Sequence, residues 1–232
     1  MKKKIVFIMN PISGTSSKAA VPSLIDSTLD KEQFEYEIKM TERPGHASEL
    51  AAEARDNHAD IVVAVGGDGT VNEVARSLVH SDSALGILPC GSGNGLARHL
   101  LLPMNLKKSI EIINACEIHD LDYGVINEYP FFCTCGMGFD AFVSMKFAES
   151  GKRGPISYAE NILREGLKYE PETYTLEDET GTKQYKAFLI SCANASQYGN
   201  NAYIAPQASM SDGLMDVVIM EPFDVIEASQ VS

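Results

Sequence analysis

Residues 61–74 read IVVAVGGDGTVNEV, and this stretch decides the fold class of the chain. Its first five residues are apolar, as expected of a parallel strand that is covered on both faces. Glycines then interrupt the chain, and Val71, Val74, Ala75 and Leu78 recur behind them at helical spacing. A buried strand, a glycine turn and an amphipathic helix form the repeating unit of parallel sheets flanked by helices. The stretch therefore predicts an α/β domain.

The same alternation of strand and helix continues on both sides of this stretch. Further strands are predicted at residues 5–9, 36–40 and 85–88, and helices at residues 21–29, 47–54 and shortly after residue 95. This regular alternation is typical of a parallel sheet with helices on its faces. We therefore expect an N-terminal nucleotide-binding domain of α/β class over residues 1–124.

Around residue 120 the pattern changes, because strands begin to follow one another directly. Strands are predicted at residues 121–126, 131–134, 173–176 and 185–193, turns at residues 127–128 and 179–181, and a helical insert at about residues 155–169. Short strands joined by turns are typical of antiparallel pairing. A second, mainly antiparallel β-rich domain is therefore expected over residues 125–232.

The composition narrows the classes of partner. The chain has 19 Lys and Arg residues against 32 Asp and Glu residues, for a net charge of −13. Such acidity argues against nucleic acid as a partner and against broad adhesion to an anionic membrane. The basic pairs Lys107-Lys108 and Lys152-Arg153 still permit transient local contact with a membrane surface. The apolar run at residues 5–9 is too short for a signal peptide or a membrane span, so we expect a cytoplasmic protein.

The cysteines are odd in number and lie in apolar surroundings. They are Cys90, Cys116, Cys133, Cys135 and Cys192. This usage fits reduced thiols that serve in packing. Cys133 and Cys135 would lie on one face of a strand, but no second pair supports a metal site there.

Three glycine-containing turns each follow a predicted strand. They lie at residues 10–14 (NPISG), 66–70 (GGDGT) and 89–95 (PCGSGNG). The exits of parallel strands lie along the carboxyl edge of the sheet, where α/β domains bind ligands. Glycines let backbone N–H groups approach an anion, and a helix N-terminus behind the turn favours phosphate. The P-loop and GxGxxG dinucleotide patterns are both missing, so a phosphate-binding edge of another kind is predicted.

Asp68 lies inside the second turn, where a negative phosphate would be expected. An acid at this position could hold Mg²⁺ between phosphate oxygens, or it could accept the proton of an attacking hydroxyl. It could also simply cap the helix that follows. In the third turn, Ser92 and Asn94 can hydrogen-bond phosphate or ribose.

Taken together, the three turns closely resemble the diacylglycerol kinase catalytic-domain family, which includes bacterial lipid kinases and sphingosine and ceramide kinases. The resemblance rests on NPISG from Asn10, GGDGTVNEV from Gly66 and PCGSGN from Pro89. It continues through Asp120 to Gly124, Gly136 to Ala141 and Ala205 to Val217, so it spans nearly all of the chain.

The resemblance implies a two-domain, ATP- and Mg²⁺-dependent kinase that phosphorylates the hydroxyl of diacylglycerol or a related lipid alcohol. It implies catalytic roles for Asp68 and Asp122, and a structural Mg²⁺ at Asp212 with the backbone carbonyls of Ser209 and Leu214. The nucleotide contacts it implies are Asn10, Pro11, Ser13, Gly14, Thr41, Gly66, Gly67, Gly69, Thr70, Asn72, Glu73, Gly91, Ser92 and Asn94. Residues 125–232 would bind the lipid substrate, and a homodimer is included among the expected assemblies.

The chain departs from the family pattern at two places. Many bacterial members have Asn-Asp where this chain has Asn94-Gly95, so an acidic member of the metal network is missing. The family's Asp-Gly-Glu motif, whose glutamate has been proposed as the general base, is not found before Ser232. Either the sequence is truncated in its second domain, or Asp68 acts as the base. An NAD kinase-like enzyme, which shares the GGDG turn, and an inert nucleotide or lipid sensor remain the alternative functions.

Overall fold

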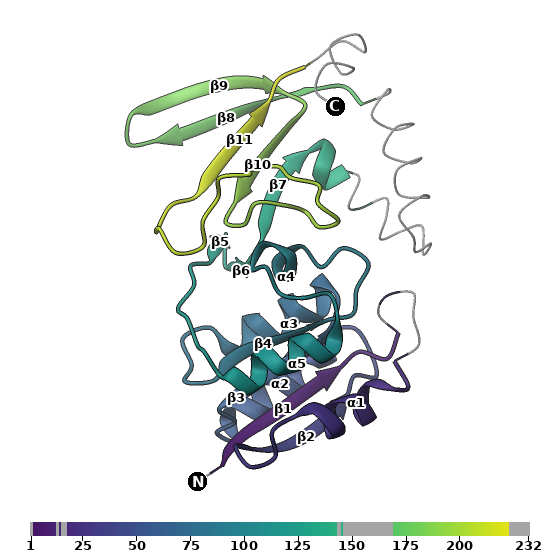
Figure 1. Cartoon of the computed structure of the whole chain (residues 1–232). Coiled ribbons are helices and arrows are strands. Elements are labelled where there is room, and N and C mark those ends of the chain that lie inside the picture. The colour runs from purple at the N-terminus through teal and green to yellow at the C-terminus, as the bar shows by residue number, and fades with distance from the viewer. Residues whose placement is uncertain (1, 13, 15–17, 143–144, 146–168, 223–232) are drawn as a thin grey trace.

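The computed structural model describes residues 2–12, 14, 18–142, 145 and 169–222. Figure 1 shows one body built around helices and a parallel sheet, and a second body built from antiparallel strands. Helix α4 (Gly95–His99) of the first body and the short strands β5 (Gly124–Ile126) and β6 (Tyr129–Phe131) of the second lie where the two bodies adjoin (Figure 1). The predicted fold class, an α/β domain followed by a β-rich domain, is confirmed.

The elements of the first body alternate as the sequence pattern indicates. In order they are β1 (Lys3–Met9), α1 (Val21–Thr28), β2 (Phe34–Met40), α2 (His46–Asp56), β3 (Ile61–Gly66), α3 (Asp68–Leu78), β4 (Ala84–Pro89), α4 (Gly95–His99) and α5 (Leu106–Ala115). Helix α5 was not predicted. Its N-cap is Asn105, whose side chain accepts a hydrogen bond from the backbone N–H of Lys108. The helix buries Ile110 and Ile113.

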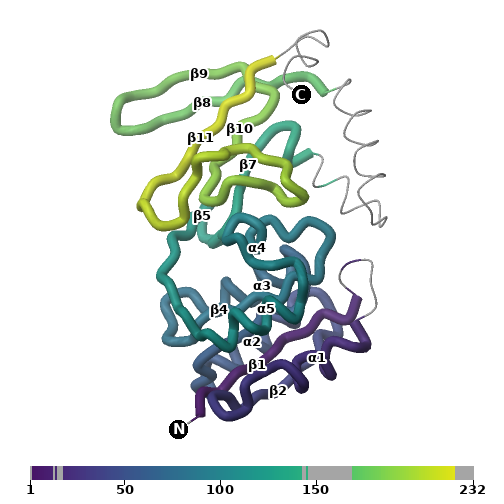
Figure 2. Tube along the Cα trace, viewed as in Figure 1, coloured from purple at the N-terminus to yellow at the C-terminus, as the bar shows by residue number. Residues whose placement is uncertain are grey.

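The four strands form a parallel sheet in the order β2-β1-β3-β4. Successive side chains of a strand point to opposite faces, so β1 contributes to two hydrophobic cores. Ile5 and Phe7 belong to the core that includes residues of α1 and α5, whereas Val6 and Ile8 belong to the core under α2 and α3. The sheet is therefore covered on both faces, as the trace in Figure 2 also shows.

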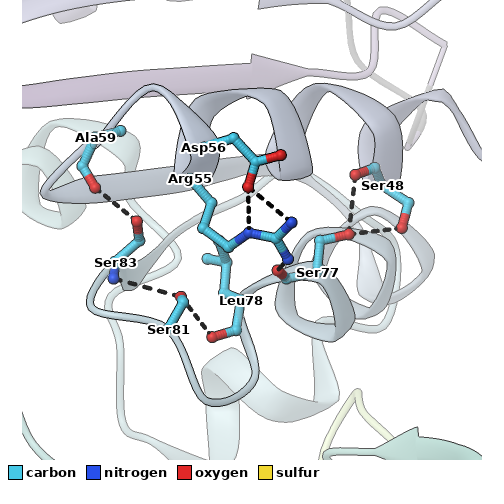
Figure 3. A network of polar contacts seen from close by, with 8 residues as sticks. All are labelled: Ser48, Arg55, Asp56, Ala59, Ser77, Leu78, Ser81 and Ser83. Carbon is cyan, nitrogen blue, oxygen red and sulfur yellow. Dashed lines mark hydrogen bonds and ion pairs between the residues drawn. The ribbon is translucent and has the colours of Figure 1, made fainter.

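Polar contacts hold α3 in place beside α2 (Figure 3). The hydroxyl of Ser77 donates to the carbonyl of Ser48 at 2.9 Å, and the two hydroxyl oxygens lie 2.7 Å apart. Arg55 donates from Nη1 to the carbonyl of Ser77 at 2.7 Å. Since α3 begins at Asp68, these contacts near its other end help to fix the direction in which the helix presents that residue.

The second body contains three small antiparallel sheets. Its strands are β5 (Gly124–Ile126), β6 (Tyr129–Phe131), β7 (Thr134–Gly138), β8 (Glu172–Asp178), β9 (Gly181–Ala187), β10 (Leu189–Ala193) and β11 (Asp216–Met220). They pair as β5-β6, β8-β9 and β11-β10-β7. The expected turn between β5 and β6 is present, with Asn127 in the left-handed region at φ 55°.

Three predicted strands are wrong in their extent. The predicted strand at residues 121–126 is shorter, because β5 begins only at Gly124. The predicted strand at residues 131–134 is divided, because β6 ends at Phe131 and β7 begins at Thr134. The predicted strand at residues 185–193 is divided at Phe188, whose N–H donates to the carbonyl of Met220 and whose carbonyl accepts from Phe139. The chain changes partners there and leaves β8 for a different sheet. Most of the expected helical insert at residues 155–169 lies outside the described residues.

Within the described ranges, none of the helices combines the length and the hydropathy needed to cross a bilayer. The five cysteines are all free thiols.

Candidate active site

The three glycine turns meet at one edge of the parallel sheet. A Cβ atom added to Gly14 would collide with the carbonyl oxygen of Cys90, and one added to Gly67 would lie 3.0 Å from the Cα of Gly91. The first turn therefore touches the third, and the third touches the second. The close approach of Gly67 and Gly91 requires residues without side chains. The sequence expectation that these strand exits converge is matched by the coordinates.

The Asp68 side chain joins the second turn to the third. Its Oδ2 accepts from the backbone N–H of Asn94 at 2.8 Å, and its Oδ1 accepts from that of Gly95 at 2.7 Å. These N–H groups belong to the N-terminus of α4, so the carboxylate satisfies donors that a helix end leaves free.

The environment of the Asp68 carboxyl group has opposing effects on its affinity for protons. The residue as a whole is exposed, but its carboxyl group points inward at α4. Desolvation of this group raises the pKa of Asp68, and the backbone hydrogen bonds from Gly95 and Asn94 lower it by less. The net effect is a pKa above the usual aspartate value, as a general base requires.

Asn94 shapes the third turn through its own side chain. The residue is buried and lies in the left-handed region at φ 52°. Its Oδ1 accepts from the N–H of Gly91 at 2.8 Å, and its Nδ2 donates to the carbonyl of Gly91 at 2.9 Å. Both ends of the amide are thus bound within the loop. Ser92, by contrast, is exposed between these partners.

The first turn is fixed against the second by Asn10. Its Nδ2 donates to Thr70 Oγ1 at 3.4 Å, and its Oδ1 accepts from the N–H of Ile12 at 3.1 Å. The carbonyl of Asn10 accepts from Nζ of Lys18 at 2.9 Å. Lys18 is only 7% exposed, and the sequence analysis missed it. Its charge places a cation beneath the first turn, although no motif marks it in the sequence.

Glu73 connects α3 to the segment that follows β2. Its two oxygens accept from the N–H groups of Gly45 and Ala47, each at 3.1 Å, at the start of α2. The same segment begins with Thr41, which is buried and donates its N–H to the carbonyl of Met9. Glu73 therefore anchors the Thr41 segment to the glycine turn.

The remaining predicted nucleotide contacts occupy the same edge with different exposure. Pro11 and Gly69 are exposed, Asn72 is half-buried and Gly66 is buried against the side chain of Thr70. Ser13 lies outside the described residues.

Asp122 lies in the segment between the two bodies. Its N–H donates to the carbonyl of Met210 at 2.7 Å, and its carbonyl accepts from Nδ2 of Asn194 at 2.8 Å. Its Oδ2 accepts from the N–H of Gly213 at 2.8 Å. The contacts with Met210 and Gly213 lie in the loop at residues 209–214. In the same loop, Asp212 Oδ1 accepts from the N–H of Leu214 at 3.0 Å. The structure therefore brings Asp122 next to the expected metal-binding loop.

A seam of contacts joins α4 and its preceding loop to the second body. His99 Nδ1 accepts from the N–H of Ser196 at 3.1 Å. A Cβ added to Gly95 would lie 2.9 Å from the carbonyl oxygen of Tyr198. Residues 94 and 199 also form an antiparallel bridge. The sequence analysis missed this seam, because its two sides are far apart along the chain.

Cys133 lies near both Asp68 and the seam. Burial, with a smaller effect from the charge of Asp68, raises the pKa of the Cys133 thiol to about 12. The thiol donates to the carbonyl of Gln197 at 3.1 Å. A thiol that stays protonated at neutral pH is a poor nucleophile, so this cysteine serves in packing.

The fold and this edge define an α/β protein with a glycine-lined edge on its parallel sheet and a second, β-rich body. Sequence families identify the class further. The family model described as "Diacylglycerol kinase catalytic domain" matches residues 4–126, and the one described as "YegS C-terminal NAD kinase beta sandwich-like domain" matches residues 133–230. The first match covers more than half of the chain, and the chain belongs to the diacylglycerol kinase catalytic domain family.

Individual relatives agree with this family. The chain is 28% identical to lipid kinase YegS of Escherichia coli (strain K12) over 207 residues, which cover 86% of this chain and 69% of the relative. It is 27% identical to diacylglycerol kinase of Staphylococcus saprophyticus over an alignment of 242 positions, which covers all of this chain and 77% of the relative. The crystal structure of a diacylglycerol kinase from Bacillus anthracis str. Sterne superimposes with a TM-score of 0.75 at 22% identity, over 94% of this chain and 75% of that one. At this identity the last comparison supports the fold alone.

Proposed function

We propose that the protein is a lipid kinase that transfers the γ-phosphoryl group of ATP to the hydroxyl of diacylglycerol or a related lipid alcohol. The relatives' names supply the class of substrate, and the site supplies the chemistry. The observation that carries the proposal is the convergence of three glycine turns around the Asp68 carboxylate.

In the proposed reaction, the acceptor hydroxyl oxygen forms a bond to Pγ while the bond from Pγ to the bridging oxygen breaks and ADP leaves. The hydroxyl proton passes to a carboxylate. Asp68 suits this role, because desolvation raises the pKa of its carboxyl group. Asp122 is proposed to act with Asp68 from the segment between the two bodies.

The nucleotide would bind along the glycine edge. The triphosphate would face the backbone N–H groups of Gly67 and Gly69, where glycines leave room for close approach. The N–H of Gly91 is bound to Asn94, so Gly91 would contribute by leaving space for the phosphates. The other predicted contacts, from Asn10 to Asn94, surround this edge and remain part of the proposal. Asn94 and Glu73 are proposed to act by shaping the edge, since their side chains bind backbone groups of the protein.

Mg²⁺ fits the donors of the loop at residues 209–214. Asp122 accepts from the N–H of Gly213 and Asp212 accepts from that of Leu214, so both carboxylates bind neighbouring backbone groups of this loop. Oxygen ligands of this kind suit a hard cation, which usually keeps several waters. Within the described ranges no three His, Cys, Asp or Glu side chains form a metal cluster, so carbonyls such as those of Ser209 and Leu214 would complete the site. Bound there, Mg²⁺ would have a structural role in this loop.

The same proposal assigns residues 1–124 to nucleotide binding and residues 125–232 to lipid binding. A cytoplasmic enzyme that contacts membrane surfaces transiently would fit the acidic composition and the local basic pairs.

A transfer assay tests this function directly. The protein is incubated with γ-labelled ATP and Mg²⁺ against micelles of diacylglycerol, sphingosine or undecaprenol, and separately against NAD. Label in the organic phase is the expected result. Label on NAD would identify an NAD kinase-like enzyme, and thermal stabilisation by ATP without transfer to any acceptor would identify a nucleotide sensor.

A further inference from the structure

Asp140 lies two residues after the end of β7, in the stretch from Gly136 to Ala141 that resembles the family but to which no role has been assigned above. Its Oδ1 accepts from the N–H of Ala141 at 2.6 Å, and its Oδ2 accepts from the hydroxyl of Tyr198 at 3.2 Å. Gly136 makes room for this carboxylate, because a Cβ at position 136 would overlap Asp140 Oδ2. Partial burial raises the pKa of Asp140, although its hydrogen bonds oppose the shift. The half-buried Asp140 carboxylate is thus hydrogen-bonded to Tyr198, a residue of another segment.

Tyr198 lies in a tight turn of residues 197–203, which we call the Tyr198 turn. The N–H of Tyr198 donates to the carbonyl of Ala202 at 3.0 Å, and Gln197, only 2% exposed, accepts from the N–H of Asn201 at 3.2 Å through Oε1. Gly199 adopts φ 117°, in the region that favours glycine. These hydrogen bonds define the internal shape of the turn, whereas the Tyr198 hydroxyl fixes its position against Asp140.

The Tyr198 turn presses on the third glycine turn through backbone contacts. A Cβ on Gly95 would lie 2.9 Å from the Tyr198 carbonyl oxygen, and a Cβ on Gly199 would lie 2.8 Å from the carbonyl carbon of Gly93. The N–H of Asn200 donates to the carbonyl of Gly93 at 3.2 Å. Main chain therefore meets main chain at this seam, and a shift of one side is transmitted to the other.

The same short loop carries the two N–H groups that bind Asp68. Asn94 donates to Oδ2 and Gly95 donates to Oδ1 of that carboxylate. A continuous set of contacts thus runs from Asp140 through Tyr198 and the third turn to Asp68.

We propose that Asp140 and Tyr198 are positioning residues for the phosphoryl transfer, because their hydrogen bond fixes the turn that holds the amides of Asn94 and Gly95 against Asp68. The inference rests on the proposed function, since it assigns these residues to the reaction in which Asp68 accepts the proton. Neither residue touches the reacting atoms in this role. Their contribution is to keep the Asp68 carboxylate in one orientation with two donors.

Hydrogen exchange tests the positioning without any substrate. In Tyr198→Phe the amides of Asn94 and Gly95 should exchange about tenfold faster than in the wild type, because the hydrogen bond that fixes their loop is lost. Tyr36→Phe is the matched control, since Tyr36 also donates to a carboxylate, that of Asp26 at 2.6 Å, on the nucleotide-binding body. It should leave both amides protected. Unchanged protection in Tyr198→Phe would overturn the inference, whatever the assay says about the kinase.

Kinetics separate positioning from general destabilisation. In Tyr198→Phe and in Asp140→Ala, turnover with lipid should fall about tenfold, and the double variant should fall no further, because each change removes the same hydrogen bond. The acid limb of the rate against pH should move to higher pH, since weaker donors let Asp68 hold its proton more tightly. A uniform loss at every pH that follows the loss of melting temperature would instead make the pair merely structural. If the wild type phosphorylates no lipid, the proposed function fails, while the exchange experiment still decides the positioning.

Discussion

The N–H of Gly95 lies 2.7 Å from Oδ1 of Asp68, and this contact joins the acid of the second glycine turn to the helix that follows the third. The carboxylate thus has a structural role as a helix-end acceptor and, in our proposal, a chemical role as the base. Glycine is required at position 95 for the seam with Tyr198. The residue that departs from the family pattern is therefore integrated into the packing of this chain.

The first prediction separates the two roles of Asp68. Asp68→Ala should lower the rate of transfer by about 10³-fold or more, because it removes the proposed base. It should also lower the free energy of unfolding by about 1–2 kcal/mol, because two amides lose a charged acceptor. Both are measured on one preparation, by label transfer and by urea denaturation. Unchanged turnover in this variant would remove Asp68 from the mechanism.

The second prediction concerns the space between Gly67 and Gly91. Gly67→Val should weaken ATP binding at least tenfold. The backbones at positions 67 and 91 approach closely, and a valine side chain would force them apart and disturb the glycine edge. Titration calorimetry with ATP measures the effect. Gly181→Ala, in the β8–β9 hairpin, is the comparison, since nothing lies within 4 Å of its Cβ position and its positive φ controls for backbone strain away from the nucleotide edge. ATP affinity like that of the wild type in Gly67→Val would contradict the placement of the phosphates.

The third prediction is that the family's acid cannot simply be restored at position 95. Gly95→Asp should lower the free energy of unfolding by about 1–3 kcal/mol, because its Cβ would press on the Tyr198 carbonyl. Gly69→Ala should be neutral or stabilising, since it lies in α3 with nothing within 4 Å of its Cβ position. Thermal denaturation of the two variants decides. Equal melting temperatures would show that the seam yields easily.

Much of the first body could be predicted because its signals are local. Apolar runs indicated β1, β3 and β4, and the three glycine turns indicated one ligand-binding edge. The partners of the side chains could not be predicted in this way. Nothing in the sequence signals that Asn94 binds Gly91, or that Glu73 anchors the start of α2.

The second body was harder to predict because its pairing is not local. Phe188 continues an apolar run, and only its hydrogen bonds to Phe139 and Met220 divide that run into β9 and β10. The seam between Gly95 and Tyr198 likewise joins residues from opposite halves of the chain. Such contacts depend on the register of several strands, which periodicity does not fix.

The fourth prediction tests Glu73 as an anchor. Glu73→Ala should lower the free energy of unfolding by about 1–2 kcal/mol, because two N–H groups at the start of α2 lose their acceptor. Glu49→Ala removes the exposed ion pair with Arg43 and should cost less than Glu73→Ala, because solvent screens the pair. Urea denaturation of both variants provides the comparison. A cost for Glu73→Ala no larger than that for Glu49→Ala would contradict the anchoring role.

The last prediction concerns the pH dependence of the seam. Burial lowers the pKa of His99 below its ordinary value of 6.5, and Nδ1 must be unprotonated to accept from the N–H of Ser196. The unfolded chain therefore binds a proton more readily than the folded one, so the contribution of neutral His99 is complete above about pH 6.5 and is lost as the pH falls below it. The difference in melting temperature between wild type and His99→Ala should be largest at pH 7–8 and should shrink toward pH 5. His119→Ala, at an exposed position, should show no such trend. A His99→Ala difference that stays constant across this range would mean that His99 does not couple the two bodies through its neutral form.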